Sequence, residues 1–583
     1  MHDVSHKGWV KRGDVIQVDI DWVLASELSW AGMEGVYDAV GRPGIFRNDR
    51  FWLAGDHRVE PELYDKPMVK ELMQKSQRAR DEFKLVEFQG FNYTILHTEF
   101  VRSRALPGQL CIGADSHSCS AGAVSCLSIG MGGADVCIPL ITGQSWFTVP
   151  ETVQFRLVGK PPKGVGGKDT ILYILGKFKR NTVAADRVAE FTGPGIAHLS
   201  CDARFAIANM CTEFGAVSGI FESDQRTLDF IDRRRTRKHR TGAVYFKPDA
   251  DAEYAETIEI DLSKVESFVA VHPSPDNVVP VDEMAGTKLD GTFIGACTTA
   301  EEDLIIGAMV LDAGLRQGQG VDKAAPGETW LSSQNRNFHN RMGPGSLANL
   351  ASAATVAASS FEMRITNPRQ LLDAINYDRL QEYLGYLPFE VNEAEGKGTL
   401  QYFEPFGVDS EDGSHHTDET GLQQEKSENN RKKLEGAPEQ TVKGRAMRLG
   451  DFIDTDAIAP SKFLASCTTN ESLGPHCMEF FMPEFREEVL RGNNIVVAGI
   501  GFGCGSSREV AVNALLGAGV QCVIAKSFAF IYARNQPNIG LLGITIKDDK
   551  FFDLAQTGAD IEVDMAKSEH RSSTMADIET IEI

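Results

Sequence analysis

The sequence lacks any long uninterrupted apolar run. A membrane-spanning helix needs roughly 20 consecutive apolar residues, whereas the stretch Ile129 to Ile141 is interrupted by glycines and by Asp135. Residues Met1 to Trp22 alternate charged and apolar side chains and have no apolar core of the kind that a secretory signal needs. We therefore expect an intracellular protein, cytoplasmic by default, with no membrane partner.

Positive charge and cysteine are also scarce. Lys and Arg number 59 against 82 Asp and Glu, which gives a formal net charge of -23 and argues against a nucleic-acid partner. An anionic substrate would then have to be bound by locally clustered arginines. The 11 cysteines include no Cys-x-x-Cys pair, and an odd number without regular spacing predicts reduced thiols rather than a disulfide framework.

What is present is an α/β pattern followed by a change of composition. From Asp14 to about Pro388, short apolar strands alternate with helical patterns and glycine turns. Residues 407–443 are rich in Ser, Glu, Gln, Asn, Lys and Gly, and we interpret them as a linker. Beyond it, strands at Asn494–Ala498 and Cys522–Ala525 flank a helix at Glu509–Leu516, which predicts a compact βαβ domain that closes over a site on the first block.

The glycine-rich segment Gly501-Phe-Gly-Cys-Gly-Ser-Ser-Arg-Glu509 is the strongest local signal. Its backbone N–H groups and Arg508 would stabilise an alkoxide on Ser506 or Ser507, so that a serine acts as a base toward a carbon acid. A dinucleotide-binding loop ranks lower because the spacing does not give GxGxxG. A tight turn without a functional role is the remaining alternative.

Four histidine- or arginine-containing segments add further candidates. Asp115-Ser116-His117 follows the strand Leu110–Gly113, where α/β enzymes place reacting groups. Taken alone, this motif is more typical of a structural histidine. His57, after Asp56, and His97 are further candidates. They favour a catalytic interpretation because three histidines tuned by carboxylates could protonate a leaving hydroxyl.

Two arginines, Arg336 and Arg341, suit a di- or tricarboxylate, although a solvated surface loop is the more common explanation of such a pair. Asn209 and Glu213 would lie one turn apart on one helix face, either in the site or as a surface pair.

In this order along the chain, these motifs resemble the aconitase superfamily from about Val18 to Ile546, and the arrangement is most similar to fused isopropylmalate isomerases and homoaconitases. The motifs are Asp56-His57, His97, Asp115-Ser-His117, Asn209 to Glu213, Gly295-Ala-Cys-Thr-Thr299, Asn335 to Arg341 and Gly503-Cys-Gly-Ser-Ser-Arg-Glu509. The resemblance implies a three-domain α/β/α core over residues 1–388, a linker over 389–444 and a swivelling β/β/α domain over 445–583.

The resemblance also implies roles for these residues in the reversible dehydration of a hydroxy di- or tricarboxylate. Ser506 would be the base that removes the proton beside a carboxylate. The remaining catalytic residues would be Asp56, His57, His97, Asp115, His117 and Glu213. Substrate would be bound by Ser116, Asn209, Arg336, Arg341, Ser507 and Arg508, and the selectivity segment would lie near Asp454–Pro460 and Lys462–Ser466.

The sequence departs from the family at the iron-sulfur ligands. Cys297 is the one recognisable ligand position, and the other two fall at about Ala313 and Arg316, neither of which supplies a thiolate. Val510 also replaces a histidine that usually follows the serine loop. An intact 4Fe-4S cluster would need a replacement pair from distant cysteines such as Cys119, Cys126 or Cys504. The sequence therefore does not predict the cluster, and it leaves either no metal or a mononuclear metal at Cys297.

Three functions remain open. The first is a lyase or isomerase of an aconitate-like or alkylmalate-like polycarboxylate that works without the cluster. The second is a cluster-free cis-trans isomerase or decarboxylase of an unsaturated tricarboxylate, for which Ser506 and the arginines would suffice. The third is a non-catalytic binding protein that kept the fold. The sequence does not indicate the substrate, the oligomeric state or the residue that reads the substrate's variable group.

Overall fold

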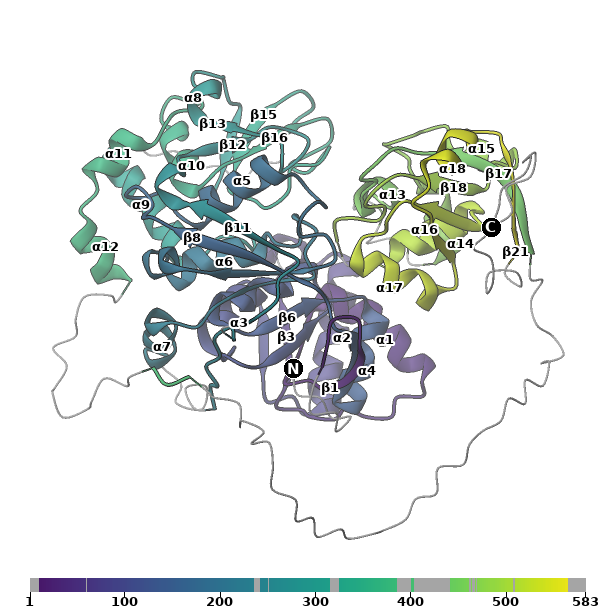
Figure 1. The fold of residues 1–583 in the computed structure, drawn as a ribbon, viewed down its shortest axis with the longest axis horizontal. Coiled ribbons are helices and arrows are strands. Elements are labelled where there is room, and N and C mark those ends of the chain that lie inside the picture. The colour runs from purple at the N-terminus through teal and green to yellow at the C-terminus, as the bar shows by residue number, and fades with distance from the viewer. Residues whose placement is uncertain are drawn as a thin grey trace, which may run out of the picture.

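The computed structural model describes residues 10–58, 60–234, 242–249, 251–314, 324–384, 400–402, 441–460, 463, 467, 469–506 and 509–564. Four larger sheets organise these residues, three in the N-terminal block and one in the C-terminal unit. Figure 1 shows the C-terminal unit, in green to yellow, standing to one side of the purple and teal block. Most of the predicted linker, residues 389–399 and 403–440, lies outside the described residues.

The first sheet is fully parallel, with the strand order β4-β3-β2-β5-β6. Every residue of its strands β2 and β3 is buried, as expected for a parallel sheet covered on both faces. The strands are β2 (Trp22–Ser26), β3 (Phe51–Gly55), β4 (Phe88–Phe91), β5 (Leu110–Gly113) and β6 (Leu127–Gly130). The covering helices are α1 (Glu27–Ala39), α2 (Pro67–Phe83), α3 (Leu96–Ser103) and α4 (Gly133–Thr142), and β1 (Val15–Asp19) pairs with β7 (Gln144–Thr148) beside them.

The second and third sheets complete the N-terminal block. The second is parallel, in the order β10-β9-β8-β11, with β8 (Thr152–Val158), β9 (Val188–Thr192), β10 (Ser218–Phe221), β11 (Glu256–Asp261), and the helices α5 (Gly167–Phe178), α6 (Cys201–Asn209) and α7 (Gln225–Asp232). The third is mixed, in the order β13-β12-β16-β15-β14. Its strands are β12 (Phe268–Ala270), β13 (Val278–Pro280), β14 (Gly291–Phe293), β15 (Thr329–Ser332) and β16 (Leu347–Leu350), with α8 (Val281–Met284), α9 (Glu301–Gly314), α10 (Ala353–Ser360), α11 (Arg369–Ala374) and α12 (Tyr377–Tyr383).

The C-terminal sheet has the order β20-β19-β18-β17-β21, in which only β21 is antiparallel to its neighbour. Its strands are β17 (Thr441–Arg448), β18 (Ile495–Ala498), β19 (Cys522–Ala525), β20 (Leu542–Thr545) and β21 (Asp560–Asp564). Its helices are α13 (Thr455–Ile458), α14 (Asn470–Leu473), α15 (Phe485–Leu490), α16 (Val510–Ala518), α17 (Phe530–Ile539) and α18 (Asp549–Leu554). The predicted βαβ order is confirmed by β18, α16 and β19, while β17 begins inside the range predicted as linker.

Among the described helices, none combines the length and the apolarity that a membrane crossing requires. All eleven cysteines are described and are free thiols. The α/β fold class that the sequence predicts is confirmed.

Candidate functional site

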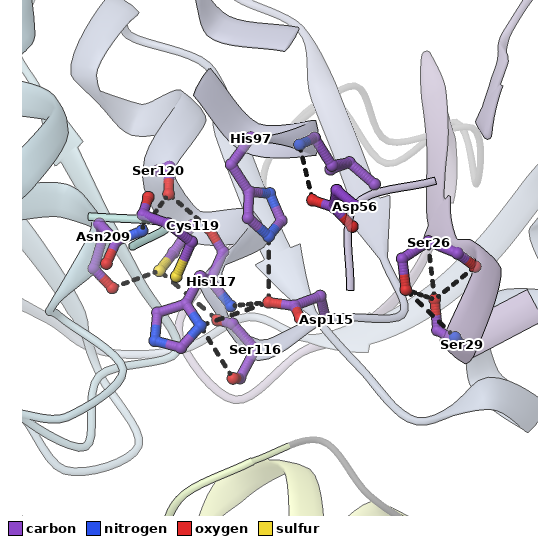
Figure 2. Close-up of polar contacts among 12 residues, drawn as sticks. Ser26, Ser29, Asp56, His97, Asp115, Ser116, His117, Cys119, Ser120 and Asn209 are labelled. Atoms are coloured by element: carbon purple, nitrogen blue, oxygen red, sulfur yellow. Dashed lines mark hydrogen bonds and ion pairs between the residues drawn. The ribbon is translucent and has the colours of Figure 1, made fainter. Parts of the chain in front are cut away.

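Asp115 is the centre of the site, and it lies two residues after β5, at the carboxyl end of the parallel sheet (Figure 2). Its Oδ1 lies 3.0 Å from Nε2 of His97 and accepts a 2.8 Å bond from the backbone N–H of His117. Its Oδ2 lies 3.5 Å from Nε2 of His57. Burial acts to raise the pKa of Asp115, but the hydrogen bonds from His117, His57 and His97 outweigh it and hold this pKa well below its usual range.

His57 is held on its other side by Asp56. The Asp56 Oδ1 lies 2.7 Å from Nδ1 of His57, and the Asp56 Oδ2 accepts the backbone N–H of Leu96 at the start of α3. Burial acts to lower the pKa of His57, yet the charge of Asp56 and the hydrogen bonds to Asp115 and Asp56 raise it well above its ordinary value. The imidazole is therefore poised to carry a proton at neutral pH.

The loop that carries His57 depends on a residue that the sequence analysis missed. Glu27, at the start of α1, is fully buried, and its carboxylate accepts the backbone N–H groups of Asp56, His57 and Arg58 at 2.6–3.3 Å. Such a carboxylate fixes the loop after β3. Nothing in the local sequence pairs Glu27 with a loop 29 residues later, because the contact exists only once β2 and β3 lie side by side.

His117 joins this cluster to Glu213. Its Nε2 lies 2.9 Å from the Glu213 Oε1 and 2.5 Å from the side-chain nitrogen of Asn335. Burial acts to lower the pKa of His117, but Cys297, Glu213 and Asp115 raise it well above its usual value. Burial acts to raise the pKa of Glu213, but His117 and Arg336 together lower it to about 2. Both shifts favour an ion pair between the His117 imidazolium and the Glu213 carboxylate.

Arg336 connects the N-terminal block to the C-terminal unit. Its Nε donates to the Glu213 Oε1 at 2.8 Å, and its Nη2 donates to the Ser116 Oγ at 3.2 Å and to the Gly505 carbonyl at 3.1 Å. Arg341, in contrast, is exposed, donates to Gln334 and lies over the ring of Phe338. The structure thus brings one of the two predicted arginines into the cluster.

The prediction that Asn209 and Glu213 share a helix face is wrong. The helix α6 ends at Asn209, and the chain turns through residues 210–215 to Gly215, whose φ of +87° suits glycine. Both side chains are nevertheless buried, so the alternative of a surface pair is also wrong. The Asn209 amide donates to the Ser120 Oγ at 2.9 Å and to the Cys297 carbonyl at 3.0 Å.

Ser506 approaches from the C-terminal unit. Its backbone N–H donates to the Thr455 Oγ1 at 2.9 Å, and its own Oγ lies 3.1 Å from the same hydroxyl. Its neighbour Gly505 accepts the bond from Arg336, so the serine loop is tied to the histidine cluster through one guanidinium. Ser507 and Arg508, as well as Lys462 and Ser466 of the selectivity segment, lie outside the described residues.

A small cavity of about 40 Å³ lies between the two parts of the chain. Its walls include Glu213 and Arg336 from the N-terminal block and Asp454, Asp456 and Gly505 from the C-terminal unit. Burial, together with the charge of Asp456, raises the pKa of Asp454 to about 6. Sequence reasoning placed Asp454 and Asp456 only in a general selectivity segment, whereas the structure puts them on the cavity wall.

Comparison with known proteins follows the same division of the chain. Residues 52–325 match the aconitase family (aconitate hydratase), and residues 422–549 match the aconitase C-terminal domain. Aconitase htyD of Aspergillus rugulosus is 49% identical over 620 aligned residues, which cover 95% of this chain and 70% of that protein. The chain belongs to the aconitase family. It is therefore a hydro-lyase or isomerase of that superfamily acting on carboxylates.

Two further relatives and one solved structure match all or part of this chain. The 3-isopropylmalate dehydratase large subunit gloJ of Glarea lozoyensis is 46% identical and covers 92% of this chain and 70% of its own length. The 3-isopropylmalate dehydratase large subunit of Acetivibrio thermocellus is 34% identical and covers 62% of this chain but 96% of its own length. The crystal structure of 3-isopropylmalate dehydratase (leuD) from Methanocaldococcus jannaschii is 43% identical over 22% of this chain and 72% of that chain, with a TM-score of 0.20.

Proposed function

We propose that the chain removes the proton beside a carboxylate of a hydroxy di- or tricarboxylate with Ser506, and protonates the departing hydroxyl from the histidines around Asp115, without an intact 4Fe-4S cluster. The observation that carries this proposal is the position of Arg336. One guanidinium contacts Ser116 beside the histidines and the carbonyl of Gly505 next to Ser506. A carboxylate bound at Arg336 would lie between base and acid.

The proposed dehydration is balanced within the site. The Ser506 alkoxide takes the carbon-bound proton, the electron pair of that C–H bond forms the double bond, and the C–O bond breaks. The leaving hydroxide takes a proton from the imidazolium of His57 or His117 and departs as water. The raised pKa values of these two histidines support the role, because each imidazole is held between two acidic groups that favour its charged form. Hydration is the same path reversed.

The cysteines support the cluster-free form of the proposal. Cys297 is half-buried beside His117, whereas the other ten cysteines are buried. Among the described residues, no cysteine belongs to a group of three or more His, Cys, Asp or Glu side chains whose ligand atoms lie close enough to share one metal ion. Ala313 occupies one expected ligand position on α9, and Arg316 lies outside the described residues. These donors do not fit a cluster that needs three thiolates.

The decisive test combines cofactor analysis with turnover. Purified protein is reconstituted anaerobically with iron and sulfide, desalted, and analysed for iron, acid-labile sulfide and visible charge-transfer absorption. The same preparation is assayed with citrate-, aconitate- and alkylmalate-type acids by the ultraviolet absorption of the conjugated double bond. Turnover without bound sulfide supports the proposal, whereas about four irons with four sulfides per chain would overturn its cluster-free part.

The role of the serine has its own test. Ser506→Ala removes the base and should lower kcat by roughly 10²- to 10⁴-fold, together with exchange of the substrate's carbon-bound proton in heavy water. Ser263→Ala, in an exposed turn after β11, is the matched control and should leave both rates unchanged. Proton exchange that survives Ser506→Ala would assign the base elsewhere.

A further inference from the structure

Lys168 is a buried lysine that no part of the proposed chemistry uses. It is the second residue of α5 and is 3% exposed. Its Nζ donates to the Gln334 carbonyl at 2.5 Å and to the Ser333 carbonyl at 3.3 Å, and it lies 3.3 Å from the Met210 Sδ. A buried ammonium is costly to desolvate unless its protons are bonded, so this placement calls for an explanation.

The two carbonyls belong to the segment that immediately precedes Asn335 and Arg336. The strand β15 ends at Ser332, and the next four residues carry both side chains that reach Glu213 and His117. Ser333 also receives the backbone N–H of Gly295 at 2.9 Å and contacts Thr299, in the loop that carries Cys297. The ammonium of Lys168 therefore holds a short segment that is shared by two functional loops.

The groups around Lys168 are mostly acidic. Glu213, Asp303, Cys297 and Asp169 all favour its charged form, while burial, the larger influence, lowers its pKa to about 8. Burial also raises the pKa of Asp169 to about 7 and that of Asp303 to about 6. None of the hydrogen bonds of the Lys168 Nζ named above goes to a carboxylate, so its defined contacts are the two carbonyls and the sulfur.

We propose that Lys168 is a positioning residue that fixes the Ser333–Arg336 segment, and thereby sets the guanidinium of Arg336 for carboxylate binding. The inference rests on the proposed function of Arg336. It does not require Lys168 to touch substrate. Its distinguishing consequence is that the effect of Lys168 on binding passes through Arg336 and disappears when Arg336 is absent.

The test is a double-mutant cycle on binding of tricarballylate, a saturated tricarboxylate that has no hydroxyl to lose. Lys168→Met keeps the length of the side chain but removes both hydrogen bonds, so Kd should rise by at least about tenfold. Arg336→Ala should raise Kd by more, and adding Lys168→Met to it should change Kd by less than about twofold. Independent, multiplying effects would overturn the inference.

Two further variants guard against loss of folding. Lys264→Met is the control, because this exposed lysine pairs with Asp261 in the turn after β11 and is not among the residues that line the cavity beside Arg336. Lys168→Arg keeps a cation with several donors and should recover most of the affinity; if Lys168→Met is unfolded in a thermal melt, the inference is judged on this variant alone. A Lys168→Arg variant that folds but binds tricarballylate as weakly as Arg336→Ala would overturn the inference.

The outcomes separate this inference from the proposed function. If the wild-type chain binds no polycarboxylate, the proposed function fails and the inference fails with it. If the wild-type chain binds tricarballylate and Lys168→Met binds it equally well, only the inference fails. In the wild type, affinity should also weaken as the pH rises through about 8, and this weakening should be absent from Lys168→Met.

Discussion

One carboxylate, that of Asp115, lies at the centre of the titratable groups of the site. Asp115 faces His57, His97 and His117, and it contributes to the raised pKa values of His57 and His117. His57 has a second carboxylate, that of Asp56, at 2.7 Å from its Nδ1. The proton available at His57 therefore depends on a residue one position away in the sequence, and this dependence can be measured.

Replacing Asp56 by Asn should move the pH profile of kcat/KM. The charge and the hydrogen bond of Asp56 raise the pKa of His57, so their loss lowers it. For dehydration, which needs the protonated imidazole, the alkaline limb should shift to lower pH in the variant, and activity at high pH should fall further than at low pH. Asp38→Asn, in the exposed ion pair with Arg42, should leave the profile unchanged. A profile that keeps its limb would remove His57 from the acid role.

Only some residues of this site could be predicted from the sequence. Asp115 could be predicted because it follows an apolar strand, and reacting groups gather at strand ends. Arg336 and Arg341 could not be distinguished, because they occupy one polar segment and differ only in which partners the fold brings near them. Glu27 could not be found at all, since its three N–H partners belong to another strand's loop.

At the scale of elements, the serine loop depends on backbone conformations that favour glycine. Gly501, Gly503 and Gly505 have φ values of +68°, +78° and +108°. A Cβ on Gly503 would lie 2.1 Å from the ring of Tyr532, which is fully buried. The glycines therefore allow the loop to turn against α17, and Ser506 emerges from this turn.

Gly503→Ala should destabilise the C-terminal unit by at least about 2 kcal/mol, because overpacking against the ring adds to the backbone strain. Gly558→Ala, at a similar φ of +93° but with open space around it, isolates the strain alone and should cost about 1 kcal/mol. Urea unfolding curves of both variants give the comparison. Equal costs would mean that the loop tolerates the methyl group and that Tyr532 yields.

The bounds of strands that consist of a short apolar run could be predicted from the sequence. The end of a helix that tertiary contacts terminate could not. The strand Leu110–Gly113 and the strand Cys522–Ala525 have the bounds expected from their apolar runs. The predicted helix face ran to Glu213, but the helix α6 ends four residues earlier, at Asn209. The chain there turns to Gly215, which packs against Asn181. Helical spacing says little about where tertiary contacts end a helix.

At the scale of the whole molecule, two polar contacts hold the C-terminal unit against α4. Arg534 on α17 donates to both oxygens of Asp135 at 2.8 and 3.0 Å, and Glu509 accepts the backbone N–H of Ala134 at 2.8 Å. Asp135 is 4% exposed, so the two hydrogen bonds from Arg534 compensate for the removal of its carboxylate from water. These contacts and the bond from Arg336 to Gly505 define the closed arrangement.

Arg534→Ala should favour separation of the two parts, because it leaves the Asp135 carboxylate buried without its partner, which costs about 2–5 kcal/mol. Cys504 lines the cavity between the parts and is 6% exposed, so its alkylation rate reports the opening. Mass spectrometry should show faster labelling of Cys504 in Arg534→Ala. The control Arg491→Ala removes an exposed ion pair within the C-terminal unit and should leave the labelling rate unchanged. Unchanged labelling would mean that Arg534 does not control closure.

The contact between Arg336 and the Gly505 carbonyl also bears on how the enzyme responds to dilution. A site whose halves belong to separate molecules must be assembled by collision, so its specific activity falls as the protein is diluted. Here residues 336 and 505 belong to one polypeptide, and assembly is intramolecular with an effective concentration that dilution does not change. Specific activity should therefore stay constant from micromolar to nanomolar enzyme, whereas a site shared by two weakly associated chains would lose activity over this range.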